Sequence, residues 1–284
     1  MISRLVTWMK ATVLFASSIF LLANNKVAAK GVTWEKPETQ TISCASYFSE
    51  ATPYGVLYNN VWNGAAAGAF AWSQCLERNH SHDSYGWSWV WPTAKGNNIY
   101  AYPQIKLGIS PWDPSSSVKS DFPIKGSTVR SLVVEHELEI QGSSEHNVAT
   151  SLWLTNTREI GDSPNPSIIV AELMIWSYAT PNHMNPAGSH TDNFEAGNQT
   201  WEVWVEKNWR DASGANDNTW VYITFRAKNQ SLKTKFDVMS FTNYAIEQQI
   251  LPADFYISDI ELGTEIMSGS GLAWVKQFNV VVNR

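Results

Sequence analysis

The sequence predicts an all-β protein, a jelly-roll sandwich of two stacked antiparallel sheets with a concave substrate cleft and one short helix. Three observations support this. Short segments rich in β-branched and aromatic residues recur along the chain, Gly, Asn, Asp and Ser separate them, and many alternate apolar with polar residues. Successive side chains of a strand point to opposite faces, so this many alternating strands requires two stacked sheets, with one face free for a ligand.

The clearest predicted strands lie between Ser84 and the C-terminal end of the chain. The first carries Trp87, Trp89 and Trp91 at a spacing of two. The predicted helix covers residues 242–249 and is ended by Pro252. In chain order, the strands span residues 84–92, 128–140, 148–155, 167–178, 201–206, 220–227, 233–239, 254–265 and 274–282.

The first residues have the pattern of a secretory signal peptide. Arg4 and Lys10 precede an apolar run over residues 11–23, and Val27-Ala28-Ala29 resembles an A-x-A cleavage site. The apolar run is too short for a comfortable membrane span. We therefore expect residues 1–29 to be removed and residues 30–284 to form a single domain. Its expected location is extracellular or periplasmic, with no membrane association after cleavage.

The mature chain is acidic. The predicted signal peptide contains Arg4, Lys10 and Lys26 of the 20 basic residues, which leaves 17 against 26 acidic residues and a net charge near −9 over 255 residues. This balance argues against nucleic acid as a partner. We find no internal repeat and no nucleotide-binding glycine motif, and we expect a monomer.

Cys44 and Cys75 are the only cysteines of the chain. In an exported protein they are expected to form a disulfide that closes the N-terminal loop. Their spacing matches no zinc pattern, and the ligand-rich His80-Ser81-His82-Asp83 segment is best interpreted as a solvated loop. We therefore expect no metal and no other cofactor.

Tryptophan is unusually abundant, with 15 residues in the chain and one of them, Trp8, in the predicted signal peptide. Indole rings suit partners such as sugars, which combine a flat apolar face with polar edges. Trp62 lies among amides in Asn59-Asn60-Val61-Trp62-Asn63, so we assign it to ligand binding. In contrast, Trp204, Trp220 and Trp274 alternate with apolar neighbours and are expected to be packing residues.

One carboxylate interrupts the most apolar segment, residues 168–176. Strand alternation places Glu172 on one face with Met174 and Trp176. An ionised Glu in such surroundings needs a partner, or its pKa rises until it is neutral. One alternative is a structural ion pair with Arg or Lys on a neighbouring strand.

A second acidic strand, residues 257–265, carries Asp259, Glu261 and Glu265 on one face. Periodicity alone does not decide whether Glu261 or Glu265 is reactive. Two carboxyl groups on either side of a bond are what glycoside hydrolysis requires, one protonated and one ionised. Together with export, acidity and the tryptophans, the two strand-borne glutamates favour polysaccharide hydrolysis.

The chain resembles glycoside hydrolase family 12 over nearly all of its mature length. The glutamate motifs are specific as a pair, although neither is so alone. In family order, the matching segments are Cys44, Tyr58-Asn59-Asn60-Val61-Trp62-Asn63, Gln74-Cys75, Trp87-Ser88-Trp89, Ala101-Tyr102-Pro103-Gln104, Glu172-Leu173-Met174-Ile175-Trp176, and Gly263-Thr264-Glu265 through Gly269.

The resemblance implies a retaining endo-β-1,4-glucanase that acts on β-glucan polysaccharides. Glu172 matches the nucleophile and Glu265 the general acid/base, which leaves Glu261 a supporting or surface role. Trp62 and Asn60 match residues that contact a glucosyl unit on the non-reducing side of the cut. By the same comparison, Met174 and Trp176 flank the nucleophile, and Cys44 and Cys75 match the family's N-terminal disulfide.

One position departs from the family pattern. Many members carry an aspartate that hydrogen-bonds the nucleophile in a Tyr-Asp-Leu-Trp-like strand, whereas this chain reads Thr150-Ser151-Leu152-Trp153. Ser151 is therefore the predicted supporting residue. Its hydroxyl can donate to Glu172 but adds no negative charge, so the family's pH behaviour does not transfer.

Two other functions fit parts of the same pattern. A non-catalytic, lectin-like sandwich would share the aromatic residues and the export signal, but it would not need two facing carboxylates. A xyloglucan-specific or xylan-specific endo-hydrolase would use the same chemistry on another chain.

Overall fold

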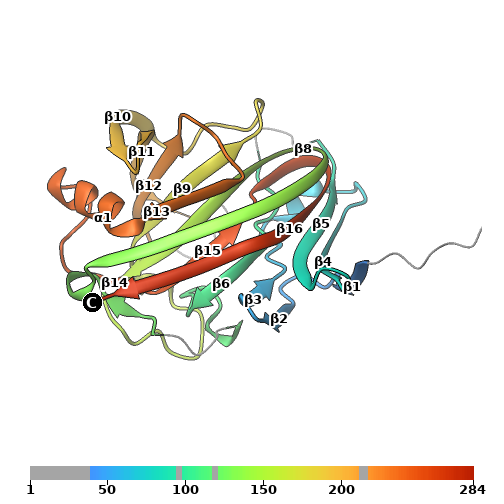
Figure 1. The fold of residues 1–284 in the computed structure, drawn as a ribbon, viewed down its shortest axis with the longest axis horizontal. Helices are drawn as coiled ribbons and strands as arrows, with labels where there is room; N and C mark the ends of the chain where they lie inside the picture. The colour runs from blue at the N-terminus through green and yellow to red at the C-terminus, as the bar shows by residue number, and fades with distance from the viewer. Residues whose placement is uncertain (1–38, 94–97, 117–120, 211–216) are drawn as a thin grey trace, which may run out of the picture. The chain divides into compact units, whose positions relative to one another are not determined.

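A single long strand, β8 (Ser131–Thr155), takes part in both sheets of the protein. The computed structural model describes residues 39–93, 98–116, 121–210 and 217–284, and the predicted signal peptide lies outside these residues. The first half of β8 pairs with β16 (Ile266–Asn283), and its second half pairs with β9 (Ile169–Ala179) and β15 (Asp259–Gly263). The sheets are therefore two layers with a shared strand (Figure 1).

The first sheet contains the N-terminal strands and the C-terminal strand of the chain. It runs in the order β1 (Thr39–Ser43), β4 (Ser73–Asn79), β5 (Ser84–Trp91), β16, β8 and β13 (Lys233–Asp237).

The second sheet carries both glutamate motifs and is therefore the one that positions the site. Its pairings run in the order β2 (Ser49–Thr52), β3 (Gly55–Tyr58), β6 (Gln104–Gly108), β15, β8, β9, β12 (Trp220–Ala227), β11 (Gln199–Trp209) and β10 (Ser189–Ala196). The short strands β7 (Ile124–Lys125) and β14 (Tyr256–Ile257) pair with each other, and β14 also pairs with β8.

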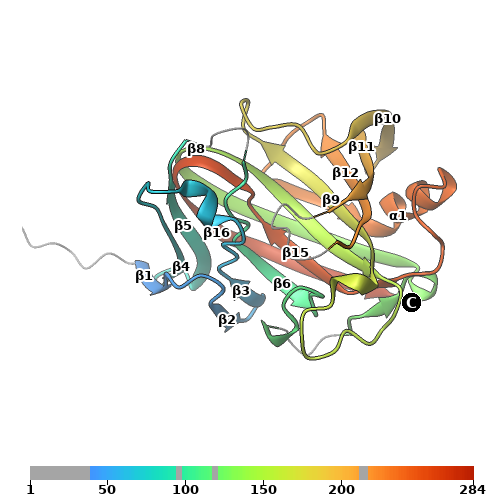
Figure 2. The same ribbon diagram turned by 180° about the vertical axis from the view of Figure 1, so that it is seen from behind.

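The predicted jelly-roll sandwich is confirmed, with one difference in strand direction. The strand pairs within the described residues are antiparallel except β9 with β12, which run parallel. Between β9 and β12, the chain leaves to form β10 and β11 and returns in the same direction, as seen from behind in Figure 2.

The hydrophobic core lies between the layers. Leu132, Val134 and Phe278 of the first sheet join Leu173 and Phe225 of the second sheet in one cluster of buried side chains. On β9, Ala171, Leu173 and Ile175 point into this cluster, as the alternation predicted. The intervening residues of β9 therefore face outward from the second sheet.

Residues 141–147 extend β8 where the sequence analysis expected a break between two strands. Their polar composition is typical of a turn, but Gly142 pairs with Gly271, and the ladder with β16 continues through this segment. Gly142 has φ = 118° and Gly269 has φ = 83°, backbone conformations that other residues rarely adopt. Cross-strand pairing therefore overrode the local turn preference.

The helix starts earlier than predicted. It is α1 (Val238–Glu247), and β13 ends at Asp237 rather than at residue 239. The Asp237 side chain accepts a hydrogen bond of 3.0 Å from Met239 N, so this residue caps the helix. Phe241 packs α1 against Phe225, with ring centroids 4.8 Å apart. No described helix has the length and apolar character needed to cross a membrane.

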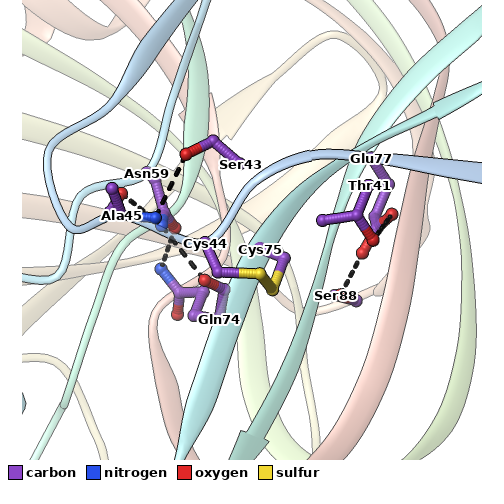
Figure 3. The surroundings of a disulfide bond; sticks show 9 residues. All are labelled: Thr41, Ser43, Cys44, Ala45, Asn59, Gln74, Cys75, Glu77 and Ser88. Carbon is purple, nitrogen blue, oxygen red and sulfur yellow. Dashed lines mark hydrogen bonds between the residues drawn. A yellow bond between two sulfur atoms is a disulfide. The ribbon is translucent and has the colours of Figure 1, made fainter.

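The predicted disulfide between Cys44 and Cys75 is confirmed, and it joins the residue after β1 to β4 (Figure 3). Beside it, Gln74 Nε2 donates to Asn59 Oδ1 at 2.9 Å, and Asn59 Nδ2 donates to the carbonyls of Ala45 and Gln74. This buried pair of amides fixes the start of the loop that carries Asn60 and Trp62. Two further strand segments, β4 and β5, are tied by Ser88 Oγ, which donates to Glu77 Oε1 at 2.6 Å.

Candidate active site

Glu172 lies in the middle of β9 on the outer face of the second sheet. Its cross-strand neighbours are Trp153 on β8 and Tyr222 on β12. The carboxylate is half-buried, and Trp220 Nε1 donates a hydrogen bond of 3.1 Å to its Oε2. The structural alternative of an Arg or Lys partner is not supported, because none of the ion pairs between described residues includes Glu172.

Burial is the main influence on the ionisation of Glu172 and raises its pKa to about 8. The hydrogen bond from Trp220 acts in the opposite direction because it stabilises the charged form. The negative charges of Glu265 and Glu261 raise the pKa further. The nucleophile predicted from the motif is therefore electrostatically linked to both acidic side chains of the other motif.

Glu265 follows β15, two residues beyond Gly263, and is also half-buried. Asn147 holds it at two points: Nδ2 donates to Glu265 Oε2, and Oδ1 accepts from Glu265 N at 2.8 Å. Burial raises the pKa of Glu265 to about 7, while the Asn147 hydrogen bond lowers it. This carboxyl is thus able to hold and release a proton near neutral pH.

Glu172 and Glu265 belong to one site. The negative charges of both raise the pKa of the buried Tyr222 hydroxyl, and both also act on Tyr102. Both tyrosines belong to a second cluster of buried side chains, separate from the core, with Ala149, Met174 and Trp176. The two carboxyl groups therefore lie on the same outer face, and both retain solvent access.

Met174 and Trp176 lie beside Glu172 in this second cluster. Tyr222 Oη donates to Met174 Sδ at 3.3 Å, and the Trp176 ring meets His183 edge to face at 5.1 Å. Both side chains are nearly fully buried, at 3% and 1% exposure. They form the floor of the site, so only a limited part of either is open to a ligand.

Trp62 and Asn60 lie in the loop after β3. The Trp62 side chain is 37% exposed, an unusual position for so large an apolar ring. Asn60 is half-buried, and its carbonyl accepts from Tyr102 N at 2.9 Å. This hydrogen bond joins the loop to the segment that carries Tyr102, which lies beside the two carboxyl groups.

Ser151 is 2% exposed and lies opposite Met174 on one side and Glu261 on the other. It is diagonal to Glu172 in the ladder, because Trp153 is the direct cross-strand neighbour of Glu172. Glu261 itself is 4% exposed. Of the two roles expected for Glu261, the surface role is therefore excluded by burial, and the supporting role remains.

Two residues that contact the carboxyl groups were missed. Trp220 was assigned to packing from its apolar neighbours, but it also donates to Glu172. Asn147 lies in a segment expected to be a turn, where an Asn is ordinary, so the sequence offered no signal for it. Of the other tryptophans assigned to packing, Trp274 is buried, whereas Trp204 is half-exposed beneath the Arg226 guanidinium at 5.3 Å.

A surface cavity of about 580 Å³ lies next to the end of β9. His183 lines it and also contacts Trp176 and the backbone of Glu265, so the cavity adjoins the site on the Glu265 side. The other polar side chains that line it are Thr180, Asn185, Glu202, Arg226, Lys228 and Gln230.

The described residues contain no group of three His, Cys, Asp or Glu side chains arranged to hold a metal ion. Two members of the 80–83 segment have protein partners. His80 Nε2 lies 2.6 Å from Gln40 Oε1, and Asp83 accepts from Arg78 at 3.1 Å.

Comparison with known proteins identifies the family. The model for glycosyl hydrolase family 12 matches residues 52–283. This chain belongs to glycosyl hydrolase family 12. The match includes both glutamate motifs and the loop of Asn60 and Trp62.

Family 12 relatives are similar over most of their length. Endoglucanase S of Pectobacterium parmentieri is 29% identical over 85% of this chain and 89% of its own. A probable xyloglucan-specific endo-beta-1,4-glucanase A of Aspergillus terreus is 26% identical, covering 92% and 94%. The family 12 xyloglucanase of Bacillus licheniformis superposes with a TM-score of 0.73 at 26% identity, covering 85% of this chain and 99% of that structure.

Membership of family 12 does not by itself establish turnover. The relatives include a protein named inactive glycoside hydrolase XLP1, from Phytophthora nicotianae.

Proposed function

We propose that the protein is a secreted endo-β-1,4-glucanase that hydrolyses internal bonds of cellulose-type glucans with retention of anomeric configuration. The main support is the pair of half-buried carboxyl groups on one outer face, with pKa values near neutrality and separate hydrogen-bond donors. Membership of family 12 and the likeness to an endoglucanase add to this.

Glu172 acts as the nucleophile and Glu265 as the general acid/base. Glu172 attacks the anomeric carbon while Glu265 protonates the departing glucan oxygen, and Glu265 then deprotonates the water that releases the glycosyl-enzyme. Catalysis requires Glu172 ionised and Glu265 protonated. Because burial raises the pKa of Glu172 to about 8 and that of Glu265 only to about 7, this form is a minority of the free protein, and the Trp220 hydrogen bond increases it. Retention requires a carboxyl separation of roughly 5 to 5.5 Å in the working complex.

The substrate side chains are assigned by position. Trp62 stacks on a glucosyl unit on the non-reducing side of the cut, and Asn60 hydrogen-bonds in the same region. Met174 and Trp176 contact the sugar next to the nucleophile, and Ser151 supports Glu172. The cavity beside His183 then receives the departing portion of the chain, because it adjoins Glu265. The reaction needs no cofactor, and the protein works as an extracellular or periplasmic monomer.

The test is hydrolysis of carboxymethyl cellulose, measured as new reducing ends. We expect turnover by the wild-type protein and none by Glu172→Gln or Glu265→Gln. Glu135→Gln is the matched control. Glu135 pairs with Lys235 at 3.5 Å and lies in the first half of β8, whereas Glu172 lies beside the second half. Glucan binding without turnover by the wild-type protein would favour the lectin-like alternative.

Azide rescue assigns the two roles separately. With an aryl β-cellobioside, Glu172→Gly should yield an α-glycosyl azide, because azide enters the space of the nucleophile. Glu265→Gly should yield the β-glycosyl azide, because azide then attacks the glycosyl-enzyme. Reversed products would exchange the two roles.

A second candidate substrate is xyloglucan. It is supported by the likeness to the xyloglucan-specific relative and to the Bacillus licheniformis xyloglucanase. Initial rates on carboxymethyl cellulose, mixed-linkage glucan, xyloglucan and xylan separate the candidates. A rate on xyloglucan far above the other three would replace cellulose-type glucan as the preferred substrate, and hydrolysis of xylan alone would contradict both.

A further inference from the structure

Glu261 is a buried acidic side chain that the proposed mechanism does not use. It lies in the middle of β15, with Lys106 of β6 opposite on one side and Ser151 of β8 opposite on the other. Ser151 in turn lies opposite Met174, two residues from Glu172 on β9. Directly opposed residues share a face, so Glu261 and Glu172 point to the same side of the sheet.

Glu261 is the acceptor of a dense local network. Its carboxylate accepts hydrogen bonds from the side chains of Asp259, Gln104 and Ser110. Burial and the charge of Glu261 raise the pKa of Asp259 well above its usual range, so Asp259 holds the proton of the pair. Burial raises the pKa of Glu261 above its ordinary value, whereas the positive charge of Lys106 and these three hydrogen bonds favour the ionised form.

Lys106 is buried, at 1% exposure, and its ammonium group makes no hydrogen bond to another described residue. The ammonium lies 4.2 Å from the Tyr58 ring centroid. A buried cation therefore remains beside Glu261, and such an arrangement is costly unless the neighbouring carboxylate is charged.

Asp259 connects this network to the donor of Glu172. Its Oδ1 accepts from Trp153 N at 3.0 Å, and Trp153 is the cross-strand neighbour of Glu172. The Trp153 ring packs edge to face against Trp220 at 5.7 Å. Trp220 donates to Glu172, so one chain of contacts runs from Glu261 to that donor.

We propose that Glu261 is a positioning residue for the nucleophile, and that it supplies from β15 the acidic neighbour that Ser151 does not supply from β8. Protonated Asp259 and Lys106 keep Glu261 charged and in place. Its negative charge acts on Glu172 through the intervening strand, and Asp259 holds the Trp153 backbone against which Trp220 packs. This inference rests on the proposed function, because it assigns Glu172 as the nucleophile.

The groups that face Glu261 come from four elements. Asp259 lies on β15, Lys106 and Gln104 on β6, Ser151 on β8, and Ser110 in the loop after β6. Glu172 lies across β8, whereas Glu265 follows Glu261 on the same segment. Tyr102 Oη donates to the Glu261 carbonyl at 3.0 Å. The negative charge of Glu261 raises the pKa of Glu172, and Lys106 is the cation among the groups named here. Removing the Glu261 charge also leaves the positive charge of Lys106 uncompensated, so both effects should lower the pKa of Glu172.

The experiment is an NMR titration of the aspartate and glutamate carboxyl carbons in the full chain, with Glu172→Gln used to assign the Glu172 signal. In Glu261→Gln we expect the pKa of Glu172 to fall by roughly half to one pH unit. The basic limb of kcat/KM, which follows Glu172 because its pKa lies above that of Glu265, should shift to lower pH by a similar amount. Glu135→Gln should shift neither. An unchanged Glu172 pKa in folded Glu261→Gln would overturn the inference.

Two further measurements complete the test. Asp259→Asn is the same shape as the protonated acid, so it should leave the pKa of Glu172 close to the wild-type value. If Glu261→Gln does not fold, the wild-type titration decides: Glu261 must be ionised and Asp259 protonated at pH 7, and the reverse would overturn the inference. A wild-type protein that hydrolyses no glucan would reject the proposed function, while the NMR titration would still decide the role of Glu261.

Discussion

Trp220 and Glu172 are joined by a 3.1 Å hydrogen bond between neighbouring parallel strands, from Nε1 of the indole to Oε2 of the carboxylate. The indole is 4% exposed, so water cannot replace it as a donor without repacking. This donor opposes the effects of burial and of two nearby negative charges on Glu172. The ionised nucleophile therefore depends on a residue whose neighbours indicated only packing.

Trp220→Phe should weaken catalysis and move its pH dependence. Because the pKa of Glu172 (about 8) lies above that of Glu265 (about 7), the basic limb of kcat/KM follows Glu172. Loss of the donor raises the pKa of Glu172 further, so the basic limb should move to higher pH. A hydrogen bond to a charged group contributes about 1.5 to 3 kcal/mol, so kcat/KM should fall about 10- to 100-fold. Trp201→Phe is the control, because Trp201 Nε1 donates to the Ala196 carbonyl at 3.1 Å in the core. An equal shift in both variants would show that the effect is not specific to the donor.

Asn147→Ala should act on the other limb of the same profile. The Asn147 hydrogen bond lowers the pKa of Glu265, so its loss should raise that pKa above about 7 and move the acidic limb, which follows Glu265, to higher pH. The maximum of kcat should fall about tenfold, because the acid/base loses its orienting partner. Asn182→Ala, which removes a donor to Glu145 at 3.0 Å, should leave both limbs in place. An acidic limb that does not move would exclude Asn147 as the partner of the titrating acid.

Trp62→Ala should raise KM for cello-oligosaccharides with little change in kcat for bonds cut far from that ring. Loss of one stacking surface corresponds to about a tenfold rise in KM. Tyr256→Ala removes another aromatic ring, on β14, and serves as the control. Equal KM values for Trp62→Ala and the wild-type protein would remove Trp62 from the substrate site.

Glu172→Gln should stabilise the protein in a pH-dependent way. Glu172 has a pKa of about 8 in the folded protein against 4.5 for the ordinary group, so between these values the unfolded chain has lost a proton that the folded protein keeps. Wild-type stability therefore falls as pH rises through this window, whereas Gln carries no such proton. The Tm of Glu172→Gln should exceed that of the wild type by a few kelvin at pH 8 and by little at pH 4. A difference independent of pH would show that Glu172 is not held neutral.

Replacement of Cys44 and Cys75 by Ser should lower the free energy of unfolding by about 3 to 4 kcal/mol, from the chain entropy of a loop of 31 residues. Chemical denaturation measures the change. The pH profile at 25 °C should keep its two limbs, because neither cysteine contacts Glu172 or Glu265. A loss of activity with unchanged stability would instead place the disulfide in the function of the Asn60 and Trp62 loop.

The sequence by itself determined the sandwich, the face of β9 that carries Glu172, Met174 and Trp176, and the disulfide partners. Each of these depends on local information: a period of two assigns a side chain to a face, and two cysteines have one possible pairing. The family motifs also selected Glu265 over Glu261, which alternation could not separate.

Tertiary structure decided what surrounds the two carboxyl groups. Trp220 is 48 positions from Glu172, Asn147 is 118 positions from Glu265, and Glu261 is 89 positions from Glu172. Only strand register brings the members of each pair close together. Burial then sets the pKa values, because desolvation depends on every chain segment that covers a group. The period of two in a strand's sequence shows which face of the sheet a side chain points to. Its charge depends on the neighbouring segments that bury it or donate hydrogen bonds to it, and the tertiary structure decides which segments these are.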